Sequence, residues 1–183
     1  YIDASLFDVQ VAMLANQASN ELVGHTHPTR MGNAHPNIVP YQVFPTRDGH
    51  MVLAVGNDGQ FERFCIASGH PEVASDPAYK TNPARVQNRQ TLVPMLTAWT
   101  MQRDTVEWGQ LLDSASVPCS PILDVEQVMT HPHLLARGMK LTSSDPAVPP
   151  MIAQPMLMDG QRLTSELAPP VLGAFVAAWN EKN

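Results

Sequence analysis

The segment from residue 30 to residue 42 carries side chains that could contact a bound molecule. It reads Arg-Met-Gly-Asn-Ala-His-Pro-Asn-Ile-Val-Pro-Tyr-Gln, so two prolines, one glycine and two asparagines fall within thirteen residues. This composition interrupts both helical and strand periodicity and predicts an irregular loop. Because loops held by a scaffold often carry function, its arginine, histidine and tyrosine are candidates for ligand contacts. Taken alone, a loop histidine such as His35 is more often structural, and both interpretations stay open.

Histidines and cysteines elsewhere give little indication of a metal site or a nucleophile. The H-x-H pairs at 25–27 and 131–133 have no carboxylate or cysteine at ligand spacing, and the chain has no HExxH motif. Cys65 and Cys119 lie too far apart to form a CxxC pair. We expect both to be buried, unreactive thiols in a reducing compartment, and we expect no metal site.

Residues 56–60, Gly-Asn-Asp-Gly-Gln, follow a predicted strand and open a predicted helix. The free N–H groups at a helix start can bind an anion. However, the segment matches neither a GxGxxG motif nor a phosphate-binding P-loop. Two interpretations stay open, one in which Asp58 caps the helix and one in which Asn57 and Asp58 face a ligand.

The composition is that of a globular chain with few charges. Hydrophobic residues make up 44% of the 183 residues, charged residues make up 15%, and the formal net charge is −6. An acidic chain lacks the basic face that binds a nucleic-acid backbone. No apolar run reaches the roughly 18 residues needed to cross a bilayer, and no secretory signal pattern is recognised. We therefore expect a cytoplasmic protein with no nucleic-acid or membrane partner.

The start of the chain predicts one amphipathic helix with an unpartnered apolar face. Asp3 is suited to cap this helix and Gly24 to end it, and apolar side chains recur at spacings of three and four residues from Phe7 to Leu22. Too little local sequence is available to bury this face or the proline-rich segment 146–170. We therefore expect both to pack against other protein.

Turn and capping signals predict a mixed α and β chain. An Asp-Gly pair lies between the β-rich runs 41–44 and 51–55, which indicates a hairpin. Asp104 and Glu107 have the spacing of a capping box. Further elements are expected as helices over 59–68, 88–101, 105–114, 124–129, 132–138 and 173–181, an extended segment over 117–122, and strands over 139–142 and 151–158.

Short motifs occur in a shared order along most of the chain. They lie at 2–8, 32–36, 39–41, 55–61, 76–77, 82, 88–89, 117–121, 136–138 and 168–173. No single motif is decisive, but their order and spacing resemble those of the family III CoA-transferases, the CaiB/BaiF family.

The resemblance implies a fold and a division of the chain. Enzymes of this family have a Rossmann-like large domain, a small domain and two linkers, and two subunits interlock like chain links. Residues 1–24 would be the last helix of the large domain and 25–41 a linker with the active-site loop. Residues 42–123 would be the small domain, and 124–183 the return linker with a C-terminal segment of the large domain.

The resemblance also implies a reaction. CoA would pass from an acyl-CoA thioester to a small, possibly dicarboxylic, acid through an aspartyl intermediate. The nucleophilic aspartate is expected upstream of Tyr1, so no catalytic residue and no permanently bound cofactor are assigned to this chain. We therefore interpret the chain as the C-terminal half of an enzyme, inactive alone, whose partners are the preceding half and a second subunit. The expected substrate-binding residues are Arg30, Asn33, His35, Asn37, Tyr41, Asn57 and Asp58.

Two other functions stay open. Related α-methylacyl-CoA racemases share the fold, but carry an Asp-Gly-Gly-Ala-Pro type of loop before the tyrosine, whereas His-Pro-Asn at 35–37 is closer to the transferases. Some transferases have a run of glycines at positions 35–38, and its absence argues against a swinging flap. Ala-Phe-Val after Gly173 departs from the family pattern and lowers the expectation of a C-terminal site. The third possibility is a non-catalytic module for dimerisation or interaction.

Overall fold

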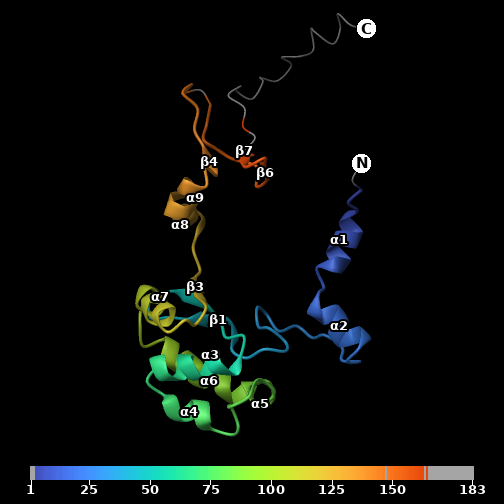
Figure 1. Ribbon diagram of the computed structural model, residues 1–183, viewed down its shortest axis with the longest axis vertical. Helices are drawn as coiled ribbons and strands as arrows, with labels where there is room; N and C mark the ends of the chain where they lie inside the picture. Colours follow the sequence, from blue (N-terminus) through green and yellow to red (C-terminus); the bar gives the residue numbers. More distant parts are fainter. Residues whose placement is uncertain (1–2, 147, 163, 165–183) are drawn as a thin grey trace, which may run out of the picture. The chain divides into compact units, whose positions relative to one another are not determined.

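The computed structural model describes residues 3–146, 148–162 and 164 (Figure 1). Helices and antiparallel strands both occur along the chain, which confirms the predicted mixed α/β class. The chain divides into two compact units, Tyr1–Ile122 and Leu123–Asn183. No helix among the described residues has the length and apolar character needed to cross a membrane.

The prediction of a single helix at the start of the chain is wrong. Two helices, α1 (Leu6–Ala12) and α2 (Asn16–Leu22), are separated by a break in which Ala15 has a φ of 46°. A left-handed residue interrupts the helical hydrogen-bond series, so one helix cannot continue through it. The N-cap is Ser5, whose hydroxyl accepts a backbone N–H of the first turn, and not Asp3.

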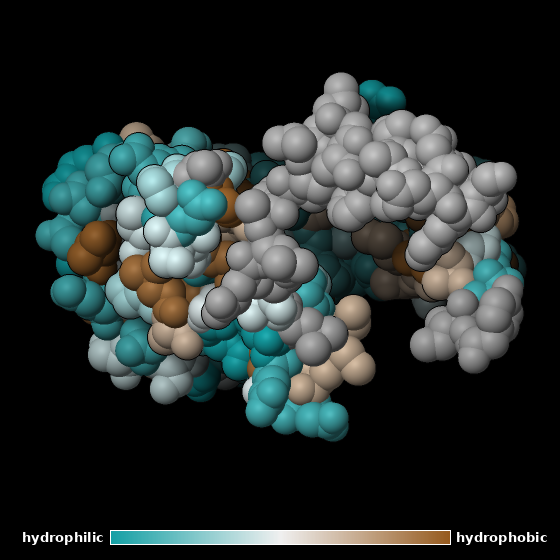
Figure 2. All heavy atoms as spheres, turned by 90° about the horizontal axis from the view of Figure 1, so that it is seen from above, coloured by the Kyte–Doolittle hydropathy of each residue, from teal (hydrophilic) through white to brown (hydrophobic). Residues whose placement is uncertain are grey.

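The apolar side chains of α1 and α2 are exposed, and neither helix has a buried residue. Phe7 and Leu22 are each 76% exposed. Figure 2 shows apolar side chains that reach the molecular surface in several places. Contact of this face with other protein stays a prediction.

The predicted hairpin is confirmed and forms two strands of a three-stranded antiparallel sheet. Strand β1 (Tyr41–Pro45) pairs with β2 (His50–Ala54), and the N–H of Thr46 closes the turn by donating to the carbonyl of Gly49 at 2.9 Å. The predicted extended segment supplies β3 (Cys119–Pro121), which pairs with the other edge of β2. The chain therefore returns to the hairpin after the helices.

Five helices lie between β2 and β3, and three of them were predicted. They are α3 (Asp58–Ala67), α4 (Pro71–Ser75), α5 (Asn82–Gln87), α6 (Arg89–Thr100) and α7 (Thr105–Ser114). The short helices α4 and α5 were not predicted, although each has a proline in its first turn. Pro94 lies inside α6. Helix α6 contacts β1, and α7 contacts β3, which brings the helices onto the sheet (Figure 1).

The observed helix caps agree only in part with the caps predicted from the sequence. The capping box of Asp104 and Glu107 at α7 is confirmed. The proposed cap of α3 by Asp58 is wrong, because Asn57 occupies the cap position and its side-chain oxygen accepts the N–H of Gln60 at 2.9 Å. Asp58 is the first helical residue, so its carboxylate is available for another contact.

The core of the first unit lies between the sheet and helices α3, α6 and α7. Trp108 is almost fully buried, and its indole N–H donates to the carbonyl of Thr100 at 2.8 Å, so its one polar atom is satisfied. Phe61, Phe64 and Cys65 of α3 are buried, and Leu111 of α7 is half-buried. The main core residues are Val39, Phe44, Met51, Leu53, Val55, Phe61, Phe64, Cys65, Leu92, Leu96, Trp99, Trp108, Leu112 and Val117.

The second unit begins with two short helices, as predicted. They are α8 (Val125–Thr130), capped by Asp124, and α9 (Pro132–Ala136), capped by His131. The predicted stop after α9 is also confirmed, because Gly138 has a φ of 61°, which favours glycine.

Four short strands follow among the described residues of the second unit. Strand β4 (Lys140–Leu141) pairs with β5 (Met151–Ile152), and β6 (Leu157–Met158) pairs with β7 (Gln161–Arg162). The prediction of one strand over 151–158 is wrong, because the side chain of Gln154 bonds to the backbone of Met156 and replaces ladder bonds there. The helix predicted over 173–181 lies outside the described residues.

The burial of Trp108 predicts a large loss of stability on truncation. We expect Trp108→Ala to lower the free energy of unfolding by about 3–5 kcal/mol, because it removes a large core side chain and leaves a cavity. The control is Val106→Ala in the same helix, at a side chain that is 68% exposed, and it should change stability by less than about 0.5 kcal/mol. Urea titration followed by circular dichroism measures both, and equal effects would contradict this description of the core.

Candidate functional site

The loop that the sequence singles out is closed by its own backbone. The N–H of His35 donates to the carbonyl of Tyr41 at 2.9 Å, so the loop begins and ends at adjacent points. A tight turn precedes it, with Gly32 at a φ of 63°, and the Val39–Pro40 peptide bond is cis. The loop is therefore a fixed connection between α2 and β1.

His35 has a defined orientation and a defined tautomer. Its ring stacks on Tyr41 with ring centres 5.3 Å apart and an interplanar angle of 16°. Its Nδ1 accepts the backbone N–H of Asn37 at 3.1 Å. A nitrogen that accepts in this way carries no proton, so the neutral ring is protonated at Nε2. His35 thus offers an oriented Nε2–H donor.

The asparagines of the loop hold it to its neighbours. Asn37 and Asn20 of α2 form a reciprocal amide pair, with Nδ2-to-Oδ1 distances of 2.8 and 3.2 Å. The side-chain oxygen of Asn33 accepts the N–H of Val43 at 2.9 Å. These bonds tie the loop to α2 on one side and to β1 on the other.

Side chains of α5 and α6 bind the backbone of the loop. Asn82 donates to the carbonyl of Asn37 at 2.8 Å and accepts the N–H of Val39 at 3.1 Å. Arg85 donates through Nε to the carbonyl of Val39 at 2.7 Å. Arg89 donates to the carbonyl of Pro36 at 2.6 Å and more distantly to that of His35, and partial burial lowers the pKa of Arg89.

The sequence did not identify these supporting residues as part of the site. Asn82 and Arg89 belong to the motifs that carry the family resemblance, but no role was assigned to them, and Arg85 was not considered. Asn82 and Arg85 are three residues apart, which places them on one face of α5, whereas Arg89 is the first residue of α6. Their targets, however, lie more than forty positions earlier in the chain.

The two candidates at the start of α3 have different partners. Asn57 caps the helix. Asp58 instead uses one carboxylate oxygen to accept from Arg85 Nη2 and from the backbone N–H of Asn82, both at 2.8 Å. Asp58 is therefore connected to the loop through Arg85 and Asn82.

Arg30 and Tyr41 are both exposed. Arg30 stands just before the loop, and the described residues offer its guanidinium no hydrogen-bond partner. Tyr41 is 39% exposed, and its ring supports that of His35. The arginine is thus accessible to an anion from solution.

The two cysteines are poor nucleophiles. Burial raises the pKa of Cys65 to about 12, and burial together with Asp113 raises the pKa of Cys119. The predicted burial is confirmed for Cys65, whereas Cys119 is only half-buried. A thiol with a raised pKa is protonated near neutral pH and reacts slowly. Within the described residues, no group of three or more histidine, cysteine, aspartate or glutamate side chains could hold a metal ion.

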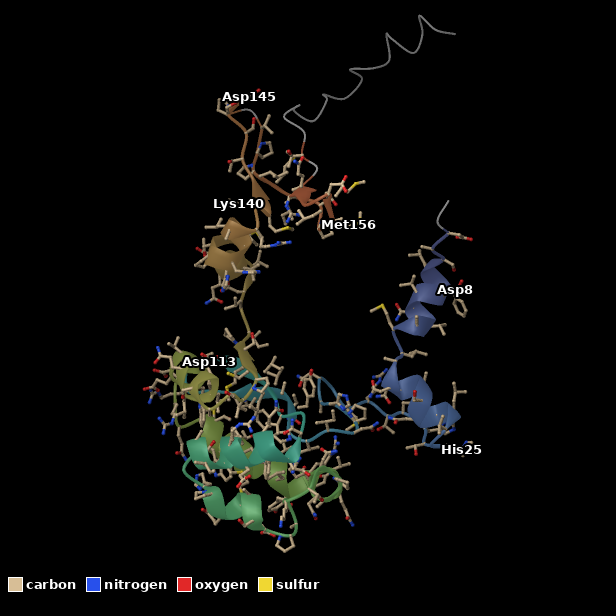
Figure 3. The ribbon with its side chains drawn as sticks, viewed as in Figure 1. Asp8, His25, Asp113, Lys140, Asp145 and Met156 are labelled. Atoms are coloured by element: carbon tan, nitrogen blue, oxygen red, sulfur yellow. The ribbon has the colours of Figure 1, made fainter. Side chains whose placement is uncertain are left out.

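Two open hollows lie away from the loop residues. One of about 600 Å³ runs beside α7 and β3, where Asp113 (labelled in Figure 3), Cys119 and Pro121 line it. The other, of about 470 Å³, lies within the second unit and is lined by apolar residues with His131, His133, Arg137 and Arg162. None of the predicted substrate-binding residues lines either hollow.

A model of the family described as CoA-transferase family III matches residues 1–175. The chain belongs to this family. A succinate–glutarate CoA-transferase from Agrobacterium fabrum is 40% identical over 179 residues, which cover 97% of this chain and 45% of that protein. A succinyl-CoA:glutarate CoA-transferase from Mus musculus is 36% identical over 173 residues, which cover 94% of this chain and 40% of that protein.

A solved structure is also similar. The crystal structure of a CaiB/BaiF family protein from Brucella suis matches with a TM-score of 0.78 and 38% identity, covering 99% of this chain and 47% of that one. The chain therefore spans about half the length of the relatives that it matches, and the family predicted from the motifs is confirmed.

Proposed function

We propose that this chain is part of an enzyme that transfers CoA from an acyl-CoA thioester to a small dicarboxylic acid. Membership of CoA-transferase family III supports the reaction class. The names of the Agrobacterium and mouse relatives support dicarboxylates such as succinate and glutarate as donor and acceptor acids. CoA enters and leaves as a thioester substrate, so the reaction needs no permanently bound cofactor.

The chemistry requires a carboxylate nucleophile, which the resemblance locates upstream of Tyr1. Its oxygen attacks the thioester carbonyl, and the C–S bond breaks. CoA leaves as a thiolate, and the donor acyl group remains on the aspartate as a mixed anhydride. The thiolate then attacks the aspartyl carbonyl and releases the donor acid. The acceptor carboxylate attacks the resulting aspartyl-CoA thioester, CoA thiolate leaves again, and a second anhydride joins the acceptor to the aspartate. The thiolate then attacks the acceptor's acyl carbonyl in this anhydride, which forms the new acyl-CoA and restores the aspartate.

The loop supplies a donor for the charge that develops during these attacks. A carbonyl oxygen under attack becomes negative, and an oriented donor lowers the energy of that state. The observation that carries this role is the bond from the Asn37 N–H to His35 Nδ1, because it keeps the proton of His35 on Nε2. Removing one such donor typically costs about 2.7–4 kcal/mol of transition-state stabilisation.

The other candidate residues divide into ligand contacts and supports. Arg30 would pair with the distal carboxylate of a diacid, because a guanidinium binds a carboxylate through two parallel N–H bonds. Tyr41 and Asn33 would hold the loop, and Asn37 would exchange its bond with Asn20 for a substrate contact. Asn57 would support the start of α3 near the substrate.

The exposed apolar face of α1 and α2 is proposed to contact the rest of the enzyme. This segment, between the labels of Asp8 and His25 in Figure 3, has no buried residue of its own. The large domain and a second, interlocked subunit would cover it, with residues 1–24 belonging to the large domain, 25–41 to a linker, 42–123 to the small domain and 124–183 to the return segment. Free, slowly reacting thiols suit the cytoplasm, where disulfides are rare.

Transfer of CoA is tested directly on the whole enzyme. Purified whole enzyme, mixed with succinyl-CoA and glutarate, should form glutaryl-CoA and succinate in equal amounts, measured by liquid chromatography with mass detection. The 183-residue chain alone should form none, because it lacks the proposed nucleophile. The proposal fails if no diacid accepts CoA while solvent deuterium enters the α-carbon of a 2-methylacyl-CoA, which is the behaviour of a racemase.

Two variants separate the donor role of His35 from a structural role. His35→Asn keeps an acceptor near the position of Nδ1 but loses the distal donor, whereas His35→Gln keeps a donor near the position of Nε2 but loses the acceptor. We expect His35→Asn to lower kcat/KM about 10²–10³-fold and His35→Gln to retain more activity. The reverse order, measured by initial rates in the whole enzyme, would show that His35 only holds the loop.

A further inference from the structure

We propose that Arg85 is a positioning residue, which orients the loop and thereby His35 while it forms an ion pair with Asp58. This inference rests on the proposed function, because it assigns a role in the same site. It assigns Asp58, predicted from the sequence as a substrate contact, to the support of the loop.

The guanidinium of Arg85 connects three separate segments. Arg85 is fully buried, and its Nε donates to the carbonyl of Val39 at 2.7 Å. Nη1 donates to the carbonyls of Tyr79 at 2.9 Å and Lys80 at 3.3 Å, and Nη2 donates to Asp58 at 2.8 Å. Because the donors of a guanidinium lie in one rigid plane, these bonds fix the position of the Val39 carbonyl relative to α3.

A buried charge of this kind is poorly explained by stability alone. Arg85 stacks on the ring of Phe61, with its guanidinium carbon 4.4 Å from the ring centre, so one face of the guanidinium packs on an apolar side chain. Removing the Arg85 guanidinium from water costs free energy, which its ion pair with the half-exposed Asp58 offsets only in part. An apolar side chain at this position could not supply directed hydrogen-bond donors. Arg85 supplies several, and its Nε donor reaches the loop.

A second path runs from Asp58 to His35 through Asn82. The carboxylate oxygen that binds Arg85 also accepts the backbone N–H of Asn82 at 2.8 Å. The side chain of Asn82 binds the carbonyl of Asn37 and the N–H of Val39, and the N–H of Asn37 binds His35 Nδ1. Asp58 is thus the common origin of two hydrogen-bond paths that end on the loop.

The carboxylate of Asp58 is accessible, which makes it a suitable point for testing. Its side chain is 53% exposed, whereas that of Arg85 is 0% exposed. Asp58→Asn keeps an acceptor oxygen for Arg85 and Asn82 but removes the charge, so the fold should tolerate it. Arg85→Lys keeps the charge, but one ammonium group cannot bond to Val39, Tyr79 and Asp58 together.

The matched control is Arg63→Lys. Arg63 also donates to two backbone carbonyls, those of Ala115 at 2.9 Å and Ser116 at 3.1 Å. These carbonyls lie between α7 and β3 and not in the loop. This substitution therefore removes the same kind of bond without altering the support of His35.

The experiment measures steady-state kinetics and hydrogen exchange on the whole enzyme. At saturating succinyl-CoA and glutarate, we expect kcat to fall at least tenfold in Arg85→Lys and less in Asp58→Asn. When the acyl-CoA concentration is varied, its KM should stay within about threefold of the wild-type value in both variants. Exchange of the backbone amides of residues 35–43 should accelerate in both variants, while exchange in α6 beyond residue 92 stays unchanged. Arg63→Lys should match wild type in kcat and in the exchange of the loop.

Two outcomes would overturn the positioning role. The first is a lowered melting temperature with kcat within twofold of wild type in both Arg85→Lys and Asp58→Asn, which would assign the pair to stability alone. The second is a reduced kcat with unchanged exchange in residues 35–43. If the wild-type enzyme transfers no CoA, the proposed function fails separately, and the exchange data still decide whether Arg85 and Asp58 hold the loop.

Discussion

A proline-rich loop cannot satisfy its own backbone, and this constraint shapes the rest of the first unit. Pro36 and Pro40 have no N–H to donate, and no helix or sheet ladder passes through the residues between them. The backbone carbonyls of this loop still need hydrogen-bond donors wherever water is excluded. Asn82, Arg85 and Arg89 supply those donors from helices α5 and α6. The two helices therefore fix the loop as well as contributing to the core.

Fixing a loop by its backbone leaves some of its side chains available. Helices α5 and α6 contact the carbonyls of the loop and the N–H of Val39, and not the imidazole of His35. The bond of His35 to Asn37 uses Nδ1, so Nε2 stays available. Preorganised donors are effective in catalysis because they need no reorientation when charge develops. A glycine-type flap moves over its ligand, whereas this loop is held at both ends before a ligand arrives.

Much of the fold could be predicted because its signals are local. The Asp-Gly turn, the capping box at Asp104 and the apolar spacing of α3, α6 and α7 each involve residues within a few positions of one another. The break at Ala15 could not be predicted, since no glycine or proline marks it. Helices α4 and α5 are only five and six residues long, which is too short to show a periodicity.

The site was predictable in one respect only. The composition of the loop indicated a fixed connection with functional side chains, but the residues that hold it could not be inferred. The bonds from Asn82, Arg85 and Arg89 join residues between 43 and 54 positions apart, and a buried arginine has no pattern in sequence. Asp58 was read as a cap or a ligand contact because its partner, Arg85, lies 27 positions away.

We propose that the fixed loop presents His35 to the acyl group of the substrate. A crystal structure of the whole enzyme with an unreactive glutaryl-CoA analogue, in which a methylene group replaces the thioester sulfur, tests this most directly. We expect His35 Nε2 to lie within hydrogen-bond distance of the analogue's carbonyl oxygen, about 2.7–3.1 Å, and Asn82 and Arg85 to keep their contacts with the loop. An acyl group bound away from His35, or a loop that has left Arg85 to reach the ligand, would contradict it.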